Sequence, residues 1–278
     1  MSQSSYWSAR GVSRRKFVAG SGTVAVGAAV LLAGCGGDSK SNGTGTPGAG
    51  ASPSAQAKQP KAGGSFRKSF SGGDAHLSPT HTGGFDIYTT FSTVYEYMWR
   101  QPLSGPLVMN GAEKIEQVDD ITYIITLRDH VYQDVAPVSG RPVSAEDVKM
   151  LSDYIIADKA VFARAFYAGQ LTSVTATDAK TVKVITKGPQ AYFYDGAVGF
   201  DRPLIPKELV AEGDLRKVKN HIGTGPWQFS SQTPGSFVEY TKFPKYWRKD
   251  QPYVEKVRAT KIDDESAREA AFRGKQLD

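Results

Sequence analysis

The sequence predicts a protein of the α/β or α+β class that follows an N-terminal leader. Segments with strand and helix patterns alternate along the chain without a long internal repeat. Hydrophobic residues make up 40% of the 278 residues and charged residues 22%, which is enough to bury a sizeable core. The 29 glycines follow no three-residue period, which excludes a collagen-like chain.

The first elements of the folded region are expected from about Gly63 onward. Ser65 to Phe70 follows a pair of glycines and predicts a short strand. The aromatic-rich run from Phe85 to Trp99 predicts a helix. In residues 121–127 every second residue, from Ile121 to Leu127, is large and apolar, which predicts a strand with one well-buried face.

The clearest helix runs from Pro142 to Ala157. Ser144 can cap the backbone amide of Asp147, a variant of the capping box. Three apolar residues recur at helical spacing and define the expected buried face: Val148, Leu151 and Ile155.

Two more strands and a last helix complete the pattern. Thr181 to Thr186 and Phe237 to Lys242 predict strands. The acidic residues 263–265 favour the positive end of a helix that starts near Asp263, and Gly274 is expected to end it.

Charge and cysteine content exclude several classes of function. The net charge is +6, but four of the 34 basic residues and no acidic residue precede residue 35, so 30 basic residues face 28 acidic ones in the remainder. A near-neutral body lacks the electrostatic footprint of a nucleic-acid-binding protein. The single cysteine, Cys35, leaves the folded part without a disulfide, a thiolate nucleophile or a cysteine metal site.

Residues 1–35 have the order of a secretory signal: a basic start, an apolar run from Val18 to Ala33 and a small-residue zone. The run is shorter than the roughly 20 residues that span a bilayer, with an uncleaved transmembrane anchor as the alternative. The sequence around Arg14 and Arg15 resembles the twin-arginine export signal. Residues 32–35 resemble the lipobox of bacterial lipoproteins, which implies that Cys35 is acylated and becomes the N-terminus.

Residues 36–61 are rich in Gly, Ser, Thr, Pro and Ala and contain no large apolar side chain, which predicts a flexible linker. A Gly-x-Gly-x-x-Gly sequence at Gly43 to Gly48 matches the dinucleotide fingerprint only formally, since no strand or helix flanks it. Leader and linker together imply a protein tethered to the outer face of the cytoplasmic membrane.

A series of short motifs follows in order between residues 63 and 278. They are Leu77-Ser78-Pro79, Val94-Tyr95-Glu96, TYIITLRD at 122–129, RPVSAEDV at 141–148, TVKVITKGPQAYF at 181–193, Ile205-Pro206-Lys207-Glu208, Gly223-Thr224-Gly225-Pro226-Trp227, Phe243-Pro244-Lys245-Tyr246-Trp247 and GKQLD at 274–278. In this order they resemble the extracytoplasmic solute-binding proteins of ABC importers, specifically the oligopeptide/dipeptide-binding (family 5) group. The sequence departs from the family pattern at His130, which replaces a glycine, and at Tyr132 to Gly140, which lengthens a tight turn.

The resemblance implies an α/β fold like that of type II periplasmic binding proteins, in which two lobes close on a ligand. It assigns residues 62–100 to the first part of lobe I, residues 101–190 to an inserted subdomain and residues 191–278 to the second part of lobe I. Because family members are longer, we expect an N-terminal fragment that stops before lobe II and binds solute weakly, since half a cleft has no closed state to stabilise.

The resemblance further implies a lipid-anchored receptor that captures a peptide or another small solute and delivers it to an ABC permease, without enzymatic activity or a cofactor. The segment after Leu-x-Pro lines the cleft in the family and corresponds here to Thr82, Gly83, Gly84 and Phe85, with an ordinary glycine loop as the alternative. Trp227 is a further candidate for the cleft, with a place in the core as the alternative.

Other chemistries have weaker support in the sequence. Asp74, His76 and His81 form a candidate metal-ligand set, but they are only three and lie in a Gly-rich segment without an HExxH helix. There is no Gly-x-Ser-x-Gly elbow and no P-loop. An exported hydrolase, and a sensor or interaction module on the same scaffold, remain the alternative functions.

Overall fold

The computed structural model describes residues 60–72, 78, 80–81, 93–100, 104–195, 200, 202–216 and 221–278. All of these belong to one unit of the chain, residues 57–278. Arg14, Arg15, Cys35 and nearly all of the predicted linker lie outside the described residues, so the expectations for them stay predictions.

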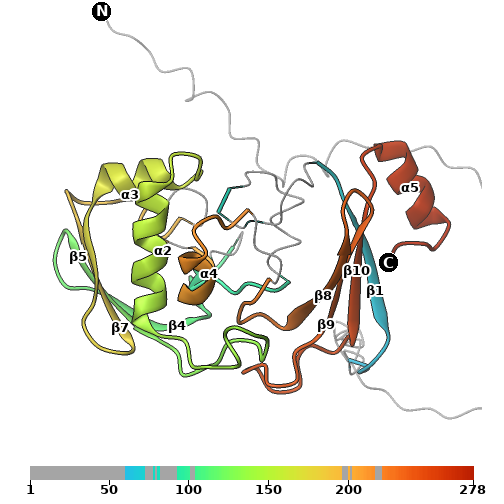
Figure 1. Cartoon of the computed structure of the whole chain (residues 1–278), viewed down its shortest axis with the longest axis horizontal. Coiled ribbons are helices and arrows are strands. Elements are labelled where there is room, and N and C mark those ends of the chain that lie inside the picture. Colours follow the sequence, from blue (N-terminus) through green and yellow to red (C-terminus); the bar gives the residue numbers. More distant parts are fainter. Residues whose placement is uncertain are drawn as a thin grey trace, which may run out of the picture. The chain divides into compact units, whose positions relative to one another are not determined.

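One four-stranded sheet joins the start of the described chain to its end. Its strands lie in the order β1 (Ser65–Phe70), β10 (Lys256–Lys261), β9 (Phe237–Lys242) and β8 (Trp227–Thr233). β1 is parallel to β10, and the other neighbours are antiparallel (Figure 1). Alternate residues of β9 and β10 are buried, as in strands that cover a core with one face. The strands predicted at 65–70 and 237–242 are confirmed.

A second, antiparallel sheet is built from residues 112–186. Its strands lie in the order β4 (Ala112–Gln117), β5 (Thr122–Leu127), β7 (Thr181–Thr186) and β6 (Leu171–Ala176). Alternate residues of β5 and β7 are buried, which confirms both predicted strands. Between β4 and β5, the side chain of Asp119 accepts hydrogen bonds from the backbone N–H groups of Ile121 and Thr122 at 2.9 and 2.8 Å, which closes the turn.

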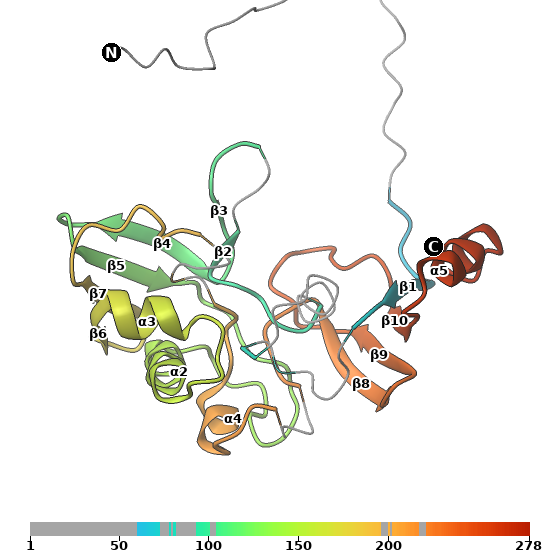
Figure 2. The ribbon, with the colours of Figure 1, turned by 90° about the horizontal axis from the view of Figure 1, so that it is seen from above.

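Helix α2 (Ala145–Ala157) packs against β6 and β7 of this sheet (Figures 1 and 2). Its predicted apolar face is buried: Val148, Leu151 and Ile155. The helix begins at Ala145 and not at Pro142, because Pro142 pairs with Val131 in a β-bridge and keeps an extended backbone. The carboxylate of Asp147 accepts hydrogen bonds from the N–H and hydroxyl of Ser144 at 2.8 and 2.9 Å, in a capping-box arrangement.

The helix predicted from Phe85 to Trp99 requires a correction. Residues 82–92 lie outside the described residues, but residues 93–94 form a turn and none of residues 95–98 is helical. Trp99 then begins β2 (Trp99–Arg100), which pairs with β3 (Val108–Met109), and Tyr97 forms a bridge with Pro203. Because these pairings need an extended backbone, a helix does not reach Trp99.

Three shorter helices are α3 (Arg164–Gln170), α4 (Lys207–Ala211) and α5 (Glu265–Arg273). α5 starts and ends where the sequence predicts, since Asp264 accepts a hydrogen bond from the N–H of Ala267 at 2.7 Å and Gly274 is the C-cap residue. No helix within the described ranges is long and apolar enough to cross a membrane.

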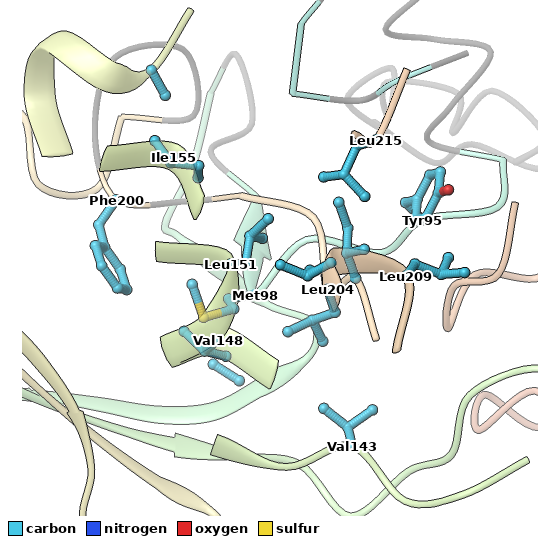
Figure 3. Packing of buried hydrophobic residues seen from close by; sticks show 14 of the residues in the cluster. Tyr95, Met98, Val143, Val148, Leu151, Ile155, Phe200, Leu204, Leu209 and Leu215 are labelled. Atoms are coloured by element: carbon cyan, nitrogen blue, oxygen red, sulfur yellow. The ribbon is translucent and has the colours of Figure 1, made fainter. Parts of the chain in front are cut away.

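Stacked aromatic rings join the second sheet to the rest of the core. The ring centroids of Tyr123 and Phe193 are 3.7 Å apart, and Phe200 lies 5.4 Å from both Phe193 and Tyr167. Each such pair contributes about 0.5–1.5 kcal/mol beyond the area that it buries. Figure 3 shows the part of the core around Phe200, where Met98 and Leu204 lie next to Val148 and Leu151 on the buried side of α2.

The Gly-Thr-Gly-Pro-Trp motif packs directly against backbone. A Cβ atom on Gly223 would lie 2.3 Å from the carbonyl oxygen of Val94, and one on Gly225 would lie 2.5 Å from the same oxygen. Gly225 instead donates its N–H to that oxygen at 2.8 Å. The buried side chain of Gln133 donates to the carbonyl of Gly225 at 3.2 Å and accepts from the N–H of Gly223 at 3.2 Å. The lengthened segment 132–140 is thereby tied to the motif.

Candidate functional site

The predicted ligand contacts lie in two segments. Thr82, Gly83, Gly84 and Phe85 lie outside the described residues, so their placement is not tested. The described chain contains Ser78, Thr80 and His81 just before them, and it contains Trp227, the other predicted contact. These described residues are held by two separate hydrogen-bond networks.

Trp227 is held by hydrogen bonds at three of its groups. Its backbone N–H donates to the carbonyl of Thr93 at 3.3 Å, and its indole N–H donates to the carbonyl of Val254 at 3.1 Å. Its own carbonyl accepts from the side chain of Gln133 at 2.8 Å. The partly buried ring packs against the core. The indole N–H is therefore committed to the fold, and only the exposed part of the ring is open to a ligand.

His81 connects the turn at residues 80–81 to the end of α2. Its Nδ1 atom lies 2.8 Å from the hydroxyl of Ser78 and 3.0 Å from the hydroxyl of Thr80. Its Nε2 atom lies 2.9 Å from a carboxylate oxygen of Asp158. The His81 side chain is only 2% exposed, so water competes little with these bonds.

Asp158 occupies the C-cap of α2, where the helix dipole disfavours a carboxylate. Two hydrogen bonds to the Asp158 carboxylate offset this unfavourable interaction with the dipole. The backbone N–H of Ala160 donates to one oxygen at 2.9 Å, and the hydroxyl of Tyr154 donates to the other at 3.2 Å. The bond from Ala160 and the contact with His81 hold the pKa of Asp158 below its usual value.

Ser78, His81 and Asp158 are the residue types of a hydrolase triad, but they lack the accessibility that catalysis needs. The nucleophile of such a triad must reach a substrate carbonyl, whereas Ser78 is completely buried. The hydroxyl of Thr80 also shares Nδ1 of the histidine. The arrangement is suited to holding a turn and not to nucleophilic attack.

The candidate metal set has no counterpart in the described part of the chain. Asp74 and His76 lie outside it, and both ring nitrogens of His81 have hydrogen-bond partners. No group of three or more His, Cys, Asp or Glu side chains that could hold a metal ion occurs among the described residues.

A second polar cluster surrounds the buried side chain of Glu96. The hydroxyl of Tyr246 and the indole N–H of Trp247 donate to its carboxylate at 3.0 and 2.7 Å. Burial raises the pKa of Glu96 above its usual value, and these two donors oppose that rise. The guanidinium carbons of Arg128 and Arg248 lie 4.4 and 4.6 Å from the centroid of a Trp247 ring. This cluster joins the chain after β9 to the segment just before β2, which contains Glu96, and to Arg128 directly after β5.

Sequence reasoning missed the roles of Asp158 and Gln133. For Asp158 a signal existed, because an acidic residue directly after a helix without a basic residue in its last turn is electrostatically out of place. For Gln133 there was none, since its side-chain partners lie at least 90 residues away in the sequence.

Comparison with known proteins identifies similar sequences. The profile of the family described as bacterial extracellular solute-binding proteins, family 5 Middle, matches residues 107–278. The nickel-binding periplasmic protein of Escherichia coli K12 is 25% identical over 191 residues, which are 67% of this chain and 35% of that protein. The glutathione-binding protein GsiB of Salmonella typhimurium is 28% identical over 153 residues, which are 55% of this chain and 29% of that protein. The chain spans about a third of the length of these curated relatives.

Solved structures share the fold. The oligopeptide-binding protein AppA of Bacillus subtilis has a TM-score of 0.69 at 19% identity, covering 79% of this chain and 44% of that one. DppA of Helicobacter pylori has a TM-score of 0.67 at 18% identity, covering 78% and 46%. MoaA of Agrobacterium tumefaciens R10 has a TM-score of 0.65 at 26% identity, covering 78% and 44%. The predicted α/β class and its likeness to type II periplasmic binding proteins are confirmed.

Proposed function

Because the chain belongs to the bacterial extracellular solute-binding proteins of family 5, we propose that it captures a small solute outside the cell for an ABC importer. The match over residues 107–278, more than half of the chain, carries this proposal. A peptide is the first candidate solute, since AppA and DppA were solved with peptides bound. Glutathione and nickel, the solutes of the curated relatives, are the next candidates.

The proposed contacts with the solute are Thr82, Gly83, Gly84, Phe85 and the exposed part of the Trp227 ring. Backbone groups of a glycine pair and two aromatic rings suit a site that is partly apolar and has a few placed polar groups. The buried Ser78 favours capture of an intact solute over hydrolysis.

A binding panel tests the proposal. The purified protein is titrated by calorimetry with two peptides, STSA and RPPGFSPFR, with glutathione and with Ni²⁺–L-histidine. Its melting temperature is recorded in the presence of each of these solutes. A bound solute raises the melting temperature by mass action, and mass spectrometry should recover it intact. Recovery of cleaved peptide would favour the hydrolase alternative. Because a chain that stops before lobe II is expected to bind solute weakly, each titration extends to the highest soluble concentration of the solute. Failure of every solute at that concentration, in a protein that melts cooperatively, would count against the receptor.

A variant and its matched control test the proposed contacts. Phe85→Ala should weaken solute binding about tenfold, since a buried aromatic contact is worth 1 kcal/mol or more. Phe66→Ala removes a ring that is 40% exposed on β1 and lies outside the proposed site, so it should leave the affinity unchanged. Equal affinities for both variants would remove Phe85 from the site.

We also propose that the protein is exported by the twin-arginine route and held at the membrane by lipid on Cys35. Cys35→Ser should release the protein from the membrane fraction and abolish labelling by radioactive palmitate. Replacing Arg14 and Arg15 together by lysine should leave the protein inside the cell. Membrane association that survives Cys35→Ser would point to the uncleaved anchor instead.

A further inference from the structure

Two arginine side chains lie against the indole of Trp247. Arg128 comes directly after β5 and Arg248 lies beyond β9, yet both guanidinium carbons are within 4.6 Å of the centroid of a Trp247 ring. Asn110 binds both arginines. Its backbone carbonyl accepts from Nε of Arg128 at 2.7 Å, and its side-chain oxygen accepts from a terminal nitrogen of Arg248 at 2.5 Å. Cation–π contacts and hydrogen bonds therefore hold the two cations in one cluster.

No carboxylate neutralises either arginine directly. In the part of the chain that the structure describes, neither Arg128 nor Arg248 forms an ion pair, and the terminal nitrogens of Arg128 and Nε of Arg248 have no hydrogen-bond partner. Arg67 differs, because it donates two side-chain N–H groups to Asp278 at 3.1 and 2.7 Å. Arg128 and Arg248 are half-buried, so part of each side chain is accessible from solvent. Their remaining N–H groups are donors that an anion can use.

The charges around the cluster leave it positive. The nearest acid that interacts with both arginines is Glu96, whose carboxylate accepts from two aromatic donors. Burial raises the pKa of Glu96, while its two donors and the charges of Arg248 and Arg128 act in the opposite direction. Lys180 and Asp129 form a pair at 3.2 Å that adds no net charge. Glu96 therefore offsets at most one of the two positive charges.

The residue types of the cluster indicate what it binds. A guanidinium group matches a planar carboxylate with two parallel N–H donors, and Arg, Trp and Tyr are enriched among the residues that contribute most to protein–protein binding. The contacts with Trp247 and Asn110 order both arginines beforehand, so they lose less side-chain entropy on binding. We propose that Arg128 and Arg248 form a docking site for the carboxylates of an acidic segment of a partner protein. This inference does not depend on the proposed function.

A blocked hexaglutamate peptide is the probe for the full-length protein, with hexaglutamine as the uncharged control peptide. Binding is followed by NMR through the indole N–H resonance of Trp247, which is assigned by its loss in Trp247→Phe. Arg128→Gln and Arg248→Gln should each raise the Kd for hexaglutamate about fivefold, because each removes a charge-assisted hydrogen bond at a partly exposed site. The matched control Arg67→Gln removes the same charge from an arginine that is already paired and should leave the Kd unchanged. Arg248→Lys keeps the charge without the planar fork and should raise the Kd roughly threefold.

Three results would overturn the docking site. The first is a Trp247 resonance that hexaglutamate does not shift in the wild-type protein. The second is a Kd in both glutamine variants, or in Arg248→Lys, equal to that of Arg67→Gln, which would reduce the effect to overall charge. The third is succinate or inorganic phosphate binding as tightly as hexaglutamate, which would assign the site to a small anion. If a glutamine variant does not fold, the wild-type resonance and Arg248→Lys decide between these results.

Discussion

Gly225→Ala tests whether the Gly-Thr-Gly-Pro-Trp motif requires glycine for space. The φ angle of Gly225 is not in the left-handed region, so alanine meets no backbone strain there. Its Cβ would instead lie 2.5 Å from the carbonyl oxygen of Val94, 2.7 Å from the Val94 carbonyl carbon and 2.8 Å from the carbonyl oxygen of Thr93. All three are backbone atoms, so no side-chain rotation relieves the contact.

The magnitude follows from the movement that alanine forces. Ordinary contacts begin at 3.4 Å, so the two backbones must separate by roughly 1 Å, at the cost of about 1–3 kcal/mol for overpacking. The same movement stretches the 2.8 Å hydrogen bond from Gly225 to Val94, which is worth about 1 kcal/mol. We expect the free energy of unfolding to fall by about 2–4 kcal/mol.

Urea denaturation followed by circular dichroism measures this loss. The matched control is Gly169→Ala in α3, where a Cβ atom has no neighbour within 4 Å and the helix should gain about 0.5–1 kcal/mol. A free energy of unfolding of Gly225→Ala within about 0.5 kcal/mol of wild type would show that the motif does not need glycine for space.

Three further predictions concern buried polar groups. Burial lowers the pKa of His130 and of His221 to about 4, so the unfolded chain takes up protons that the folded protein does not. The free energy of unfolding should therefore fall as the pH drops from about 6.5 to 4, by up to about 3 kcal/mol per histidine, and a flat profile in urea titrations across this range would contradict it. Gln133→Ala leaves the buried carbonyl of Gly225 and N–H of Gly223 without this partner and should lower the free energy of unfolding by about 2–3 kcal/mol in the same assay. A loss below about 1 kcal/mol would argue against a structural role for Gln133. Arg141→Ala removes the cation that pairs with the buried carboxylate of Asp147 and should lower the free energy of unfolding by about 3 kcal/mol. A melting temperature equal to that of wild type would show that this ion pair does not stabilise the fold.

The elements that the sequence predicted correctly have local signals. In β5 and β7 large apolar residues recur at every second position, such as Tyr123 and Ile125 or Val182 and Val184, and α5 is bounded by an acidic cap and a glycine. β8 and β10 were not predicted, because β8 has no aliphatic residue and the only buried side chains of β10 are Val257 and Ala259. Their strand conformation depends on pairing with β9, which lies between them in the sheet.

The candidate site likewise combines residues that the sequence indicated with contacts that it did not indicate. The sequence pointed to the segment after Leu77-Ser78-Pro79 through a family resemblance, and it noted His81 only as a candidate metal ligand. Nothing local in the sequence pairs His81 with Asp158, because the contact depends on where α2 ends relative to the turn. The hydrogen bonds of the buried side chain of Gln133 with Gly223 and Gly225 could not be predicted either, because these residues lie at least 90 positions away in the sequence.

The sequence by itself determined the class of the fold, the strands and helices with strong periodicity, and the resemblance to a family. These depend on interactions between residues a few positions apart, which a linear pattern records. Only the tertiary structure decided that residues 93–100 are not helical, that Gly223 and Gly225 face the backbone of Val94, and that Asp158 contacts His81. Each of these depends on distances between segments remote in the chain, and such distances are set when the two sheets, α2 and the aromatic core pack together.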